Sequence, residues 1–219
     1  MNDETIRPSS DAKNGTKDQE SRKSSLLFCV SGSIAAITVI DALRMLVERA
    51  IFHRIYVALT RGALKFVREE PFAILSGRRC VTDIFHDALE GDPVHVRIAR
   101  ECGLALIAPA SANVMAKLAH GIADDAVTNI LNVFEGPRIL VPAAHPATSR
   151  LPSFHRNLRT LRDDGFYCCG PVDGYSISEN RRAADVGAIP RPEVIAAYVE
   201  YVASYGQAPD VKFKYSSEA

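Results

Sequence analysis

Short apolar runs alternate with longer amphipathic stretches between residues 26 and 201. The runs are typical of strands buried on both faces of a sheet, and apolar spacings of three or four residues are typical of helices. Strands are expected over 26–31, 53–59, 104–109, 138–141 and 166–169. Helices are expected over 34–49, 62–68, 112–120, 125–134, 152–164 and 191–201. This alternation predicts an α/β fold, a parallel sheet with helices on both faces.

Both ends of the chain have the composition of tails. Residues 1–25 carry only Met1, Ile6 and Ala12 as apolar side chains, and they include five acids and five bases. We expect this segment to be disordered, because it cannot bury enough surface to offset its ordering entropy. A second short tail is expected over 206–219. The folded domain is therefore expected to span 26–205.

Composition excludes several classes of protein. The 26 basic and 26 acidic residues cancel, which disfavours a nucleic-acid partner. No apolar run approaches the roughly 18 residues of a membrane span, and the polar start resembles neither a signal peptide nor an anchor. The five cysteines form no C-x-x-C pair, so we expect reduced thiols in a cytoplasmic protein, with no metal site.

Function is expected where strands end, because ligands of parallel sheets bind beyond the carboxyl ends of the strands. The first strand is followed by Ser31, Gly32, Ser33 and Ile34, a small turn that opens a helix. Its N–H groups suit a phosphate, although a plain helix cap is an equal alternative. Thr60 follows the second strand and could reach the same phosphate, but alone it is more often a cap. The glycine motifs of NAD, FAD and ATP sites are absent.

Small residues follow the third strand, in the string Pro109-Ala110-Ser111-Ala112-Asn113. They would let a flat ring approach the backbone, and Ser111 and Asn113 offer hydrogen bonds to a polar ring edge. Without context, a proline-marked turn with a helix cap is the more frequent interpretation.

Two of the six histidines stand close to the expected strand ends. His95 lies just before the third strand and would be a natural general base if it faced the pocket. His145 follows Ala144 after the fourth strand. A structural or turn histidine is the alternative in both cases. No His, Cys, Asp or Glu group has metal-ligand spacing, and no G-x-S-x-G nucleophile elbow is present.

Five strings, in this order and spacing, resemble the homo-oligomeric flavin-containing cysteine decarboxylases. That family includes phosphopantothenoylcysteine decarboxylase and the peptidyl-cysteine decarboxylases of lantibiotic biosynthesis. The resemblance covers about 26–201. The strings are 30–36, Thr60, the segment around His95, 109–113 and 119–125.

The resemblance implies a flavodoxin-like Rossmann fold that binds FMN. It also implies assembly from trimers, as a homotrimer or a dodecamer, with the flavin near a subunit interface. His95 would be the active-site histidine. The implied phosphate contacts are Gly32, Ser33, Ile34 and Thr60, and the implied ribityl and ring contacts are Ser111, Ala112 and Asn113, in the string that starts at Pro109.

Two departures from the family pattern bear on the substrate. The family's Pro-x-Met-Asn after the fourth strand reads Pro-Ala-Ala-His here, so Ala144 and His145 stand where the family holds the substrate carboxylate. The flap over 171–180 also lacks the cysteine with which coenzyme A pathway members return a proton, and Cys168 and Cys169 precede it.

A member without the flap cysteine resembles the peptide-modifying branch. We therefore expect a lyase that oxidatively decarboxylates the C-terminal cysteine of a precursor peptide to an aminoenethiol. Alternatives are phosphopantothenoylcysteine decarboxylation and a non-catalytic FMN-binding regulatory protein. A relative of the flavin prenyltransferases is a weaker alternative.

Overall fold

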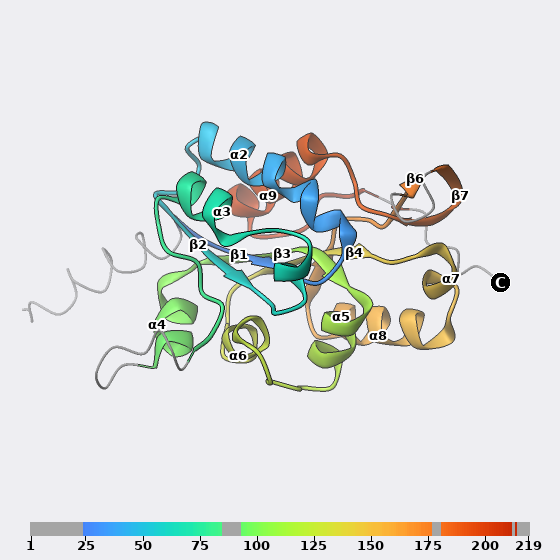
Figure 1. Ribbon diagram of the computed structural model, residues 1–219, viewed down its shortest axis with the longest axis horizontal. Coiled ribbons are helices and arrows are strands. Elements are labelled where there is room, and N and C mark those ends of the chain that lie inside the picture. Colours follow the sequence, from blue (N-terminus) through green and yellow to red (C-terminus); the bar gives the residue numbers. More distant parts are fainter. Residues whose placement is uncertain (1–23, 85–92, 177–180, 212, 214–219) are drawn as a thin grey trace, which may run out of the picture.

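The computed structural model describes residues 24–84, 93–176, 181–211 and 213 (Figure 1). Its centre is a five-stranded parallel sheet with the order β2-β1-β3-β4-β5. This is the flavodoxin-like order, so the expected fold class is confirmed. The strands are β1 (Ser25–Val30), β2 (Arg54–Leu59), β3 (Leu104–Ser111), β4 (Arg138–Ala143) and β5 (Phe166–Cys168).

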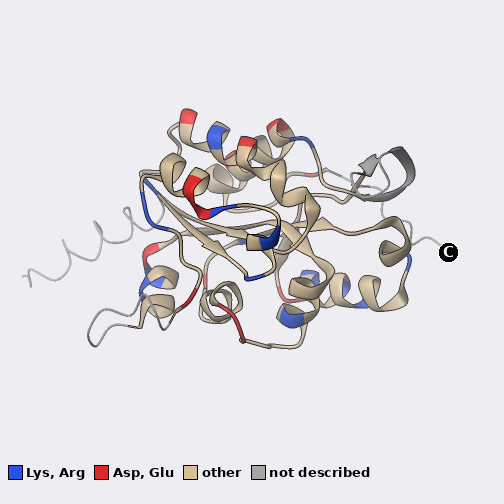
Figure 2. Cartoon of the chain, viewed as in Figure 1, with Lys and Arg blue, Asp and Glu red and all other residues tan. Residues whose placement is uncertain are grey.

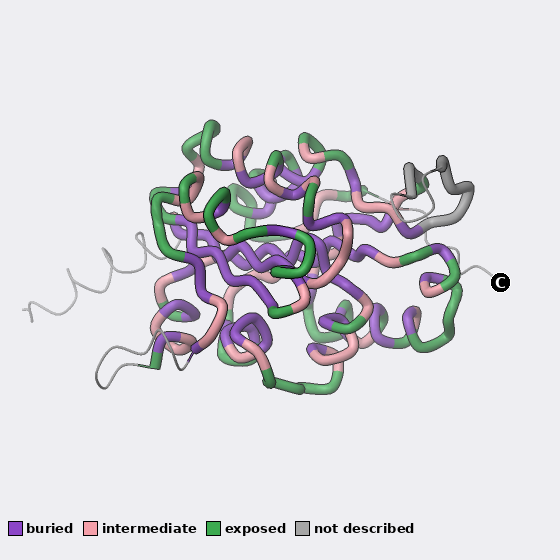
Figure 3. Tube along the Cα trace, viewed as in Figure 1, coloured by how far each residue is buried: buried purple, intermediate pink, exposed green. Residues whose placement is uncertain are grey.

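Helices cover both faces of the sheet, as Figure 1 shows. Because the sheet lies between two helical layers, β1 and β3 are buried along their whole length, whereas β5 is only partly buried (Figure 3). One layer contains α2 (Val39–Glu48), α3 (Glu69–Ser76) and α9 (Pro192–Tyr205). The other contains α4 (Val94–Glu101), α5 (Ala112–Ala119), α6 (Ala126–Asn132) and α8 (Pro152–Asp163).

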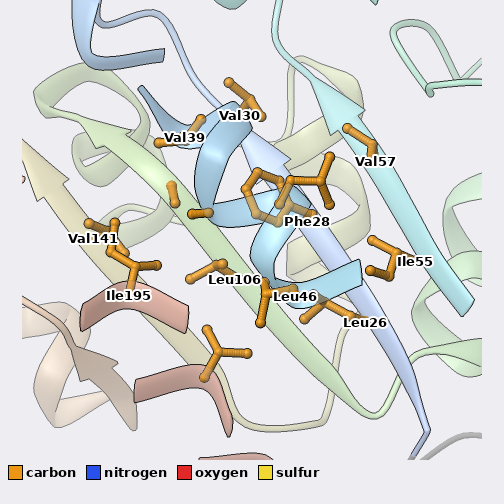
Figure 4. Packing of buried hydrophobic residues seen from close by; sticks show 14 of the residues in the cluster. Leu26, Phe28, Val30, Val39, Leu46, Ile55, Val57, Leu106, Val141 and Ile195 are labelled. Carbon is orange, nitrogen blue, oxygen red and sulfur yellow. The ribbon is translucent and has the colours of Figure 1, made fainter. Parts of the chain in front are cut away.

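Alternating side chains of β1 build two cores, one on each face of the sheet. Leu26 and Phe28 pack toward α2 and α9 (Figure 4), whereas Leu27 and Cys29 pack toward the opposite helices. All of these side chains are fully buried. An uninterrupted apolar run is therefore required here, since both faces of the strand are removed from water.

An antiparallel hairpin of β6 (Val172–Ser176) and β7 (Arg181–Ala188) follows the sheet. The backbone N–H of Ala144 donates to the carbonyl of Gly187 at 3.1 Å, so the hairpin lies against the turn after β4. Of the expected flap 171–180, residues 177–180 lie outside the described residues.

Several sequence-based expectations about helices were wrong in detail. The expected helix 34–49 is divided at Thr38, whose hydroxyl donates to the carbonyl of Ala35 at 2.8 Å, into the 3₁₀ helix η1 (Ile34–Ile37) and α2. The expected helix 62–68 is only the 3₁₀ turn η2 (Ala63–Lys65). Helices α3 and α4, the short α7 (Pro146–Ser149) and the hairpin were not predicted.

Parts of both ends of the chain lie outside the described residues. Of the expected tail 1–25, only Ser24 and Ser25 are described, and Ser25 is the first residue of β1. After Gly206, Ala208 and Phe213 pack against the core, and the Phe213 ring lies 6.2 Å from that of Tyr198.

Candidate functional site

The turns after β1 and β3 meet at the topological switch point of the sheet. The chain leaves β1 toward β2 on one side and returns through β3 on the other. Crevices at such points are where ligands of open α/β sheets bind. The hydroxyl of Ser31 donates to the Pro109 carbonyl at 2.7 Å and accepts the Ser111 N–H at 2.8 Å. Ser31 is buried, so this side chain fixes the two turns together.

The turns after β1 and β2 touch through two glycines. A Cβ atom at Gly32 would lie 3.0 Å from both Cα and C of the Gly62 backbone. The Thr60 N–H donates to the Val30 carbonyl at 3.0 Å, which continues the parallel pairing to this point. A side chain at position 32 would therefore require the Gly62 backbone to shift by a few tenths of an ångström, and the contact places the two 3₁₀ turns side by side.

Hydrogen-bond donors gather in these two turns. Ser33 caps η1 by accepting the Ala35 N–H at 3.3 Å, and Thr60 accepts the Ala63 N–H at 3.1 Å. Each hydroxyl keeps its O–H as a donor. Within the described residues, the N–H groups of Gly32 and Ile34 reach no protein acceptor. Together these are four donors at one end of the sheet.

The charge around these donors suits an anion. Segments 31–36 and 60–65 contain no acidic residue, whereas Arg61 and Lys65 are basic and exposed. Backbone N–H groups at the start of a helical turn form a favourable phosphate site. The residues present therefore fit a phosphate group.

The turn after β3 presents an open amide beside this cradle. Ser111 caps α5 by accepting the Val114 N–H at 3.4 Å. Ala112 is half-buried, and Asn113 is exposed in the first turn of the helix. The Asn113 side chain makes no hydrogen bond within the described chain, so its amide is available to a ligand.

The turn after β4 adds His145 to the same edge. Ser111 pairs with Ala143 in the β3–β4 register, so Ala144 and His145 extend beyond the sheet beside Ser111. His145 caps α7, with Nδ1 accepting the Ala147 N–H at 3.1 Å.

His95 does not join these residues within one chain. It lies in the first turn of α4, seven residues before Cys102, or about 10 Å along the helix. The next residue, Gly103, donates its N–H to the Ser25 carbonyl at the start of β1. Ser31, however, lies about 20 Å along the strand from Ser25. Figure 1 accordingly shows α4 toward the end of the sheet away from η1 and α7.

Two of the buried cysteines, Cys169 after β5 and Cys29 on β1, are unsuited to reaction. Cys169 is fully buried, and this burial, with a smaller effect of the neighbouring Cys168 thiol, raises the pKa of Cys169 to about 12. Burial likewise raises the pKa of Cys29, on β1. Neither side chain supplies a thiolate near neutral pH.

Sequence reasoning did not find two elements of the site. Ser31 was considered as a helix cap, but Ser33 caps η1 and Ser31 joins β1 to β3. Gly62 was not singled out. The signal that could have found it is a glycine shortly after each of two neighbouring strands, Gly32 two residues after Val30 and Gly62 three residues after Leu59.

Two searches of the described residues gave negative findings. They contain no group of three His, Cys, Asp or Glu side chains placed to hold a metal ion. None of their helices is both long and apolar enough to cross a membrane.

Known proteins resemble this chain over most of its length. A flavoprotein family model matches residues 14–201. The coenzyme A biosynthesis bifunctional protein CoaBC of Bacillus subtilis (strain 168) is 34% identical over 150 residues, which are 68% of this chain. That alignment spans only 36% of the relative, so the chain corresponds to about a third of its length.

Two solved structures share the fold. The FMN-dependent cysteine decarboxylase TvaF from thioviridamide biosynthesis is 36% identical, with a TM-score of 0.62 over 67% of this chain and 90% of that one. A PPC decarboxylase variant complexed with pantothenoylaminoethenethiol is 25% identical, with a TM-score of 0.72 over 82% and 98%. With the family match and the flavodoxin-like strand order, these similarities establish that the chain belongs to the flavoprotein family.

Proposed function

We propose that the chain binds FMN at the switch point between β1 and β3. The phosphate lies at the N–H groups of Gly32 and Ile34 and the hydroxyls of Ser33 and Thr60. The four unused donors in a cradle without acids support this placement. The isoalloxazine ring lies against the turn after β3, which begins at Pro109 and contains Ser111, Ala112 and Asn113.

We further propose that the reaction is the oxidative decarboxylation of a cysteine at the C-terminus of a peptide. FMN, when bound, supplies the two-electron oxidation of the carbon that carries sulfur, and the resulting C=S group accepts the electrons released as CO₂ leaves. The protein's part is to bind the thiol and carboxylate in the correct orientation beside the ring.

Residues of the β3 and β4 turns have the chemistry for this task. The Asn113 amide offers N–H and C=O groups to the ring edge. Beside it, Ala144 leaves space, and His145 is assigned to the substrate carboxylate. The β6–β7 hairpin lies against this turn through Gly187.

His95 completes the site from a second copy of the chain. Within one chain, the lengths of α4 and β1 keep His95 away from the sheet edge at which the other site residues lie. If the site lies at the boundary between two subunits of a trimer, His95 of one subunit can reach the site residues of its neighbour. The symmetry of the assembly repeats this contact at each boundary. In that position His95 holds or accepts the proton of the substrate thiol.

The observation that favours a peptide is the lack of cysteine in the hairpin. Residues 170–190 contain none, and Cys169 before them is a buried, protonated thiol. No cysteine there would return a proton to the unsaturated product, so the product leaves as an enethiol.

The second candidate is phosphopantothenoylcysteine decarboxylation, because the curated relative is a coenzyme A biosynthesis protein. One experiment separates the two. The purified protein is incubated with a hexapeptide ending in Cys or with phosphopantothenoylcysteine, and the masses of the products are measured by mass spectrometry. Loss of CO₂ and two hydrogens from the peptide alone supports our proposal. Conversion of phosphopantothenoylcysteine alone supports the second candidate, and bound FMN without turnover would indicate a regulatory protein.

A further inference from the structure

A basic surface extends from the candidate site along α8. Residues 144–162 contain four Arg and two His but no Asp or Glu, in a chain whose net charge is zero. The local excess of positive charge is therefore a property of this segment. We name the exposed residues Arg150, Arg156, Arg159 and Arg162 the α8 basic stripe, and Figure 2 marks Lys and Arg positions of the chain in blue.

The stripe is not needed to hold the helix in place. α8 is anchored through the opposite face, where Phe154, Leu158 and Leu161 are buried in the core. Arg156 and Arg159 are exposed, and neither guanidinium has an acidic partner within the described chain. Structural ion pairing therefore does not explain these two charges.

The stripe begins at the candidate site and leads away from it. Helix α7 starts directly after His145, and α8 follows α7. Helix α5, which starts beside Asn113, packs along α8. A molecule whose end lies between the β3 and β4 turns can therefore extend over the stripe without crossing the sheet (Figure 1).

We propose that the α8 basic stripe binds an acidic segment of the substrate peptide, upstream of the cysteine that enters the site. This rests on the proposed peptide substrate. The twelve residues of α8 extend about 18 Å, which an extended peptide spans in five or six residues. Glu or Asp side chains roughly four to ten positions before the terminal Cys would then face Arg156 and Arg159. Such contacts increase the association rate and weaken in salt.

Two fluorescent twelve-residue peptides test the proposal. Both end in the same four residues with a terminal Ser in place of Cys, so that binding is read by anisotropy without turnover. One carries three Glu at the upstream positions, and the other carries Gln. At low salt the Glu peptide should bind about fivefold more tightly, and the difference should disappear in 0.3 M salt, at roughly twice physiological ionic strength.

The test variant combines Arg156→Gln with Arg159→Gln. The control variant combines Arg54→Gln with Arg68→Gln, which removes two exposed arginines elsewhere in the chain. The first should abolish the preference for the Glu peptide and leave turnover of a short Cys-ending peptide unchanged, whereas the control should retain the preference. Equal binding of the two peptides, or equal loss in both variants, would overturn the proposal.

Three further outcomes separate this proposal from others. If no Cys-ending peptide is decarboxylated but the Glu preference persists, the proposed reaction fails and the docking surface stands. If the Arg156→Gln and Arg159→Gln variant changes the oligomer mass in sedimentation, a second copy covers the stripe and the proposal is wrong. Displacement of the Glu peptide by a short RNA oligonucleotide at lower concentration than by unlabelled peptide would also refute it.

Discussion

The hydroxyl of Ser31 accepts the backbone N–H of Ser111 at 2.8 Å, although the two residues are 80 positions apart in the chain. The same hydroxyl donates to the Pro109 carbonyl at 2.7 Å. One small side chain thus sets the spacing between the turn proposed to hold the FMN phosphate and the turn proposed to hold its ring.

Ser31→Ala is expected to weaken both the fold and cofactor binding. It leaves the buried N–H of Ser111 without its partner, which costs about 2 kcal/mol of unfolding free energy, whereas the Pro109 carbonyl keeps the backbone N–H of residue 31 at 3.3 Å. Urea unfolding and flavin absorbance per protein chain measure the two effects. For the unfolding free energy alone, the comparison is Ser33→Ala, which removes one long cap bond and should cost about 1 kcal/mol or less. An unchanged flavin content in Ser31→Ala would contradict the bridging role.

Gly32→Asp is expected to yield a folded, colourless protein. Its Cβ would lie 3.0 Å from the Gly62 backbone, and its carboxylate would repel the phosphate. Gly206→Ala, at a positive φ in open space far from the turns, is the control and should lose about 1 kcal/mol of stability but no flavin. Normal flavin content in Gly32→Asp would exclude the phosphate site.

His95→Asn is expected to retain the yellow colour but lose turnover, whereas Asn113→Asp should lose the flavin. If His95 acts across a subunit boundary, unfolding and refolding the two variants together should restore activity. Random assembly places an intact pair at about one quarter of the sites. Activity is measured as CO₂ loss by mass spectrometry. The composition of the mixed oligomers is verified by native mass spectrometry. If these oligomers recover no activity, His95 acts on the flavin bound to its own chain.

Unfolding free energy is expected to fall as pH rises above about 9. Burial raises the pKa of Cys169 to about 12 in the folded chain, above its ordinary value near 9. Between these values the folded state holds a proton that the unfolded state releases, so stability is complete below pH 9 and decreases toward pH 12. Cys169→Ala should flatten this slope in denaturant titrations, and Cys168→Ala, at a less buried position, should flatten it less. Equal slopes in all three proteins would contradict this assignment.

The strands could be predicted because burial on both faces leaves a plain signal, as in the run from Leu26 to Val30. The separation of η1 from α2 at Thr38 could not be predicted, because the spacing of apolar residues is nearly the same in 3₁₀ and α helices. The α4 helix has only eight residues, half of them polar, so the sequence placed His95 beside a strand without showing which end of the sheet it faces.

Helix caps in the candidate site could be predicted as far as local chemistry reaches. Ser111 and His145 cap helices, as their positions after strands suggest. The bridge made by Ser31 depends on β1 and β3 being neighbours, which no local pattern encodes. The same is true of the contact between Gly32 and Gly62.

The N-terminal strand occupies a central place in the sheet, and this has a consequence for synthesis on the ribosome. β1 can pair with β2 early, but its other edge stays open until β3 has been translated and has left the exit tunnel. During that interval an apolar strand with unpaired backbone groups is exposed, which favours association with chaperones or with other nascent chains. The proposed FMN site therefore forms late, and a polypeptide truncated before residue 104 would have no route to the native state.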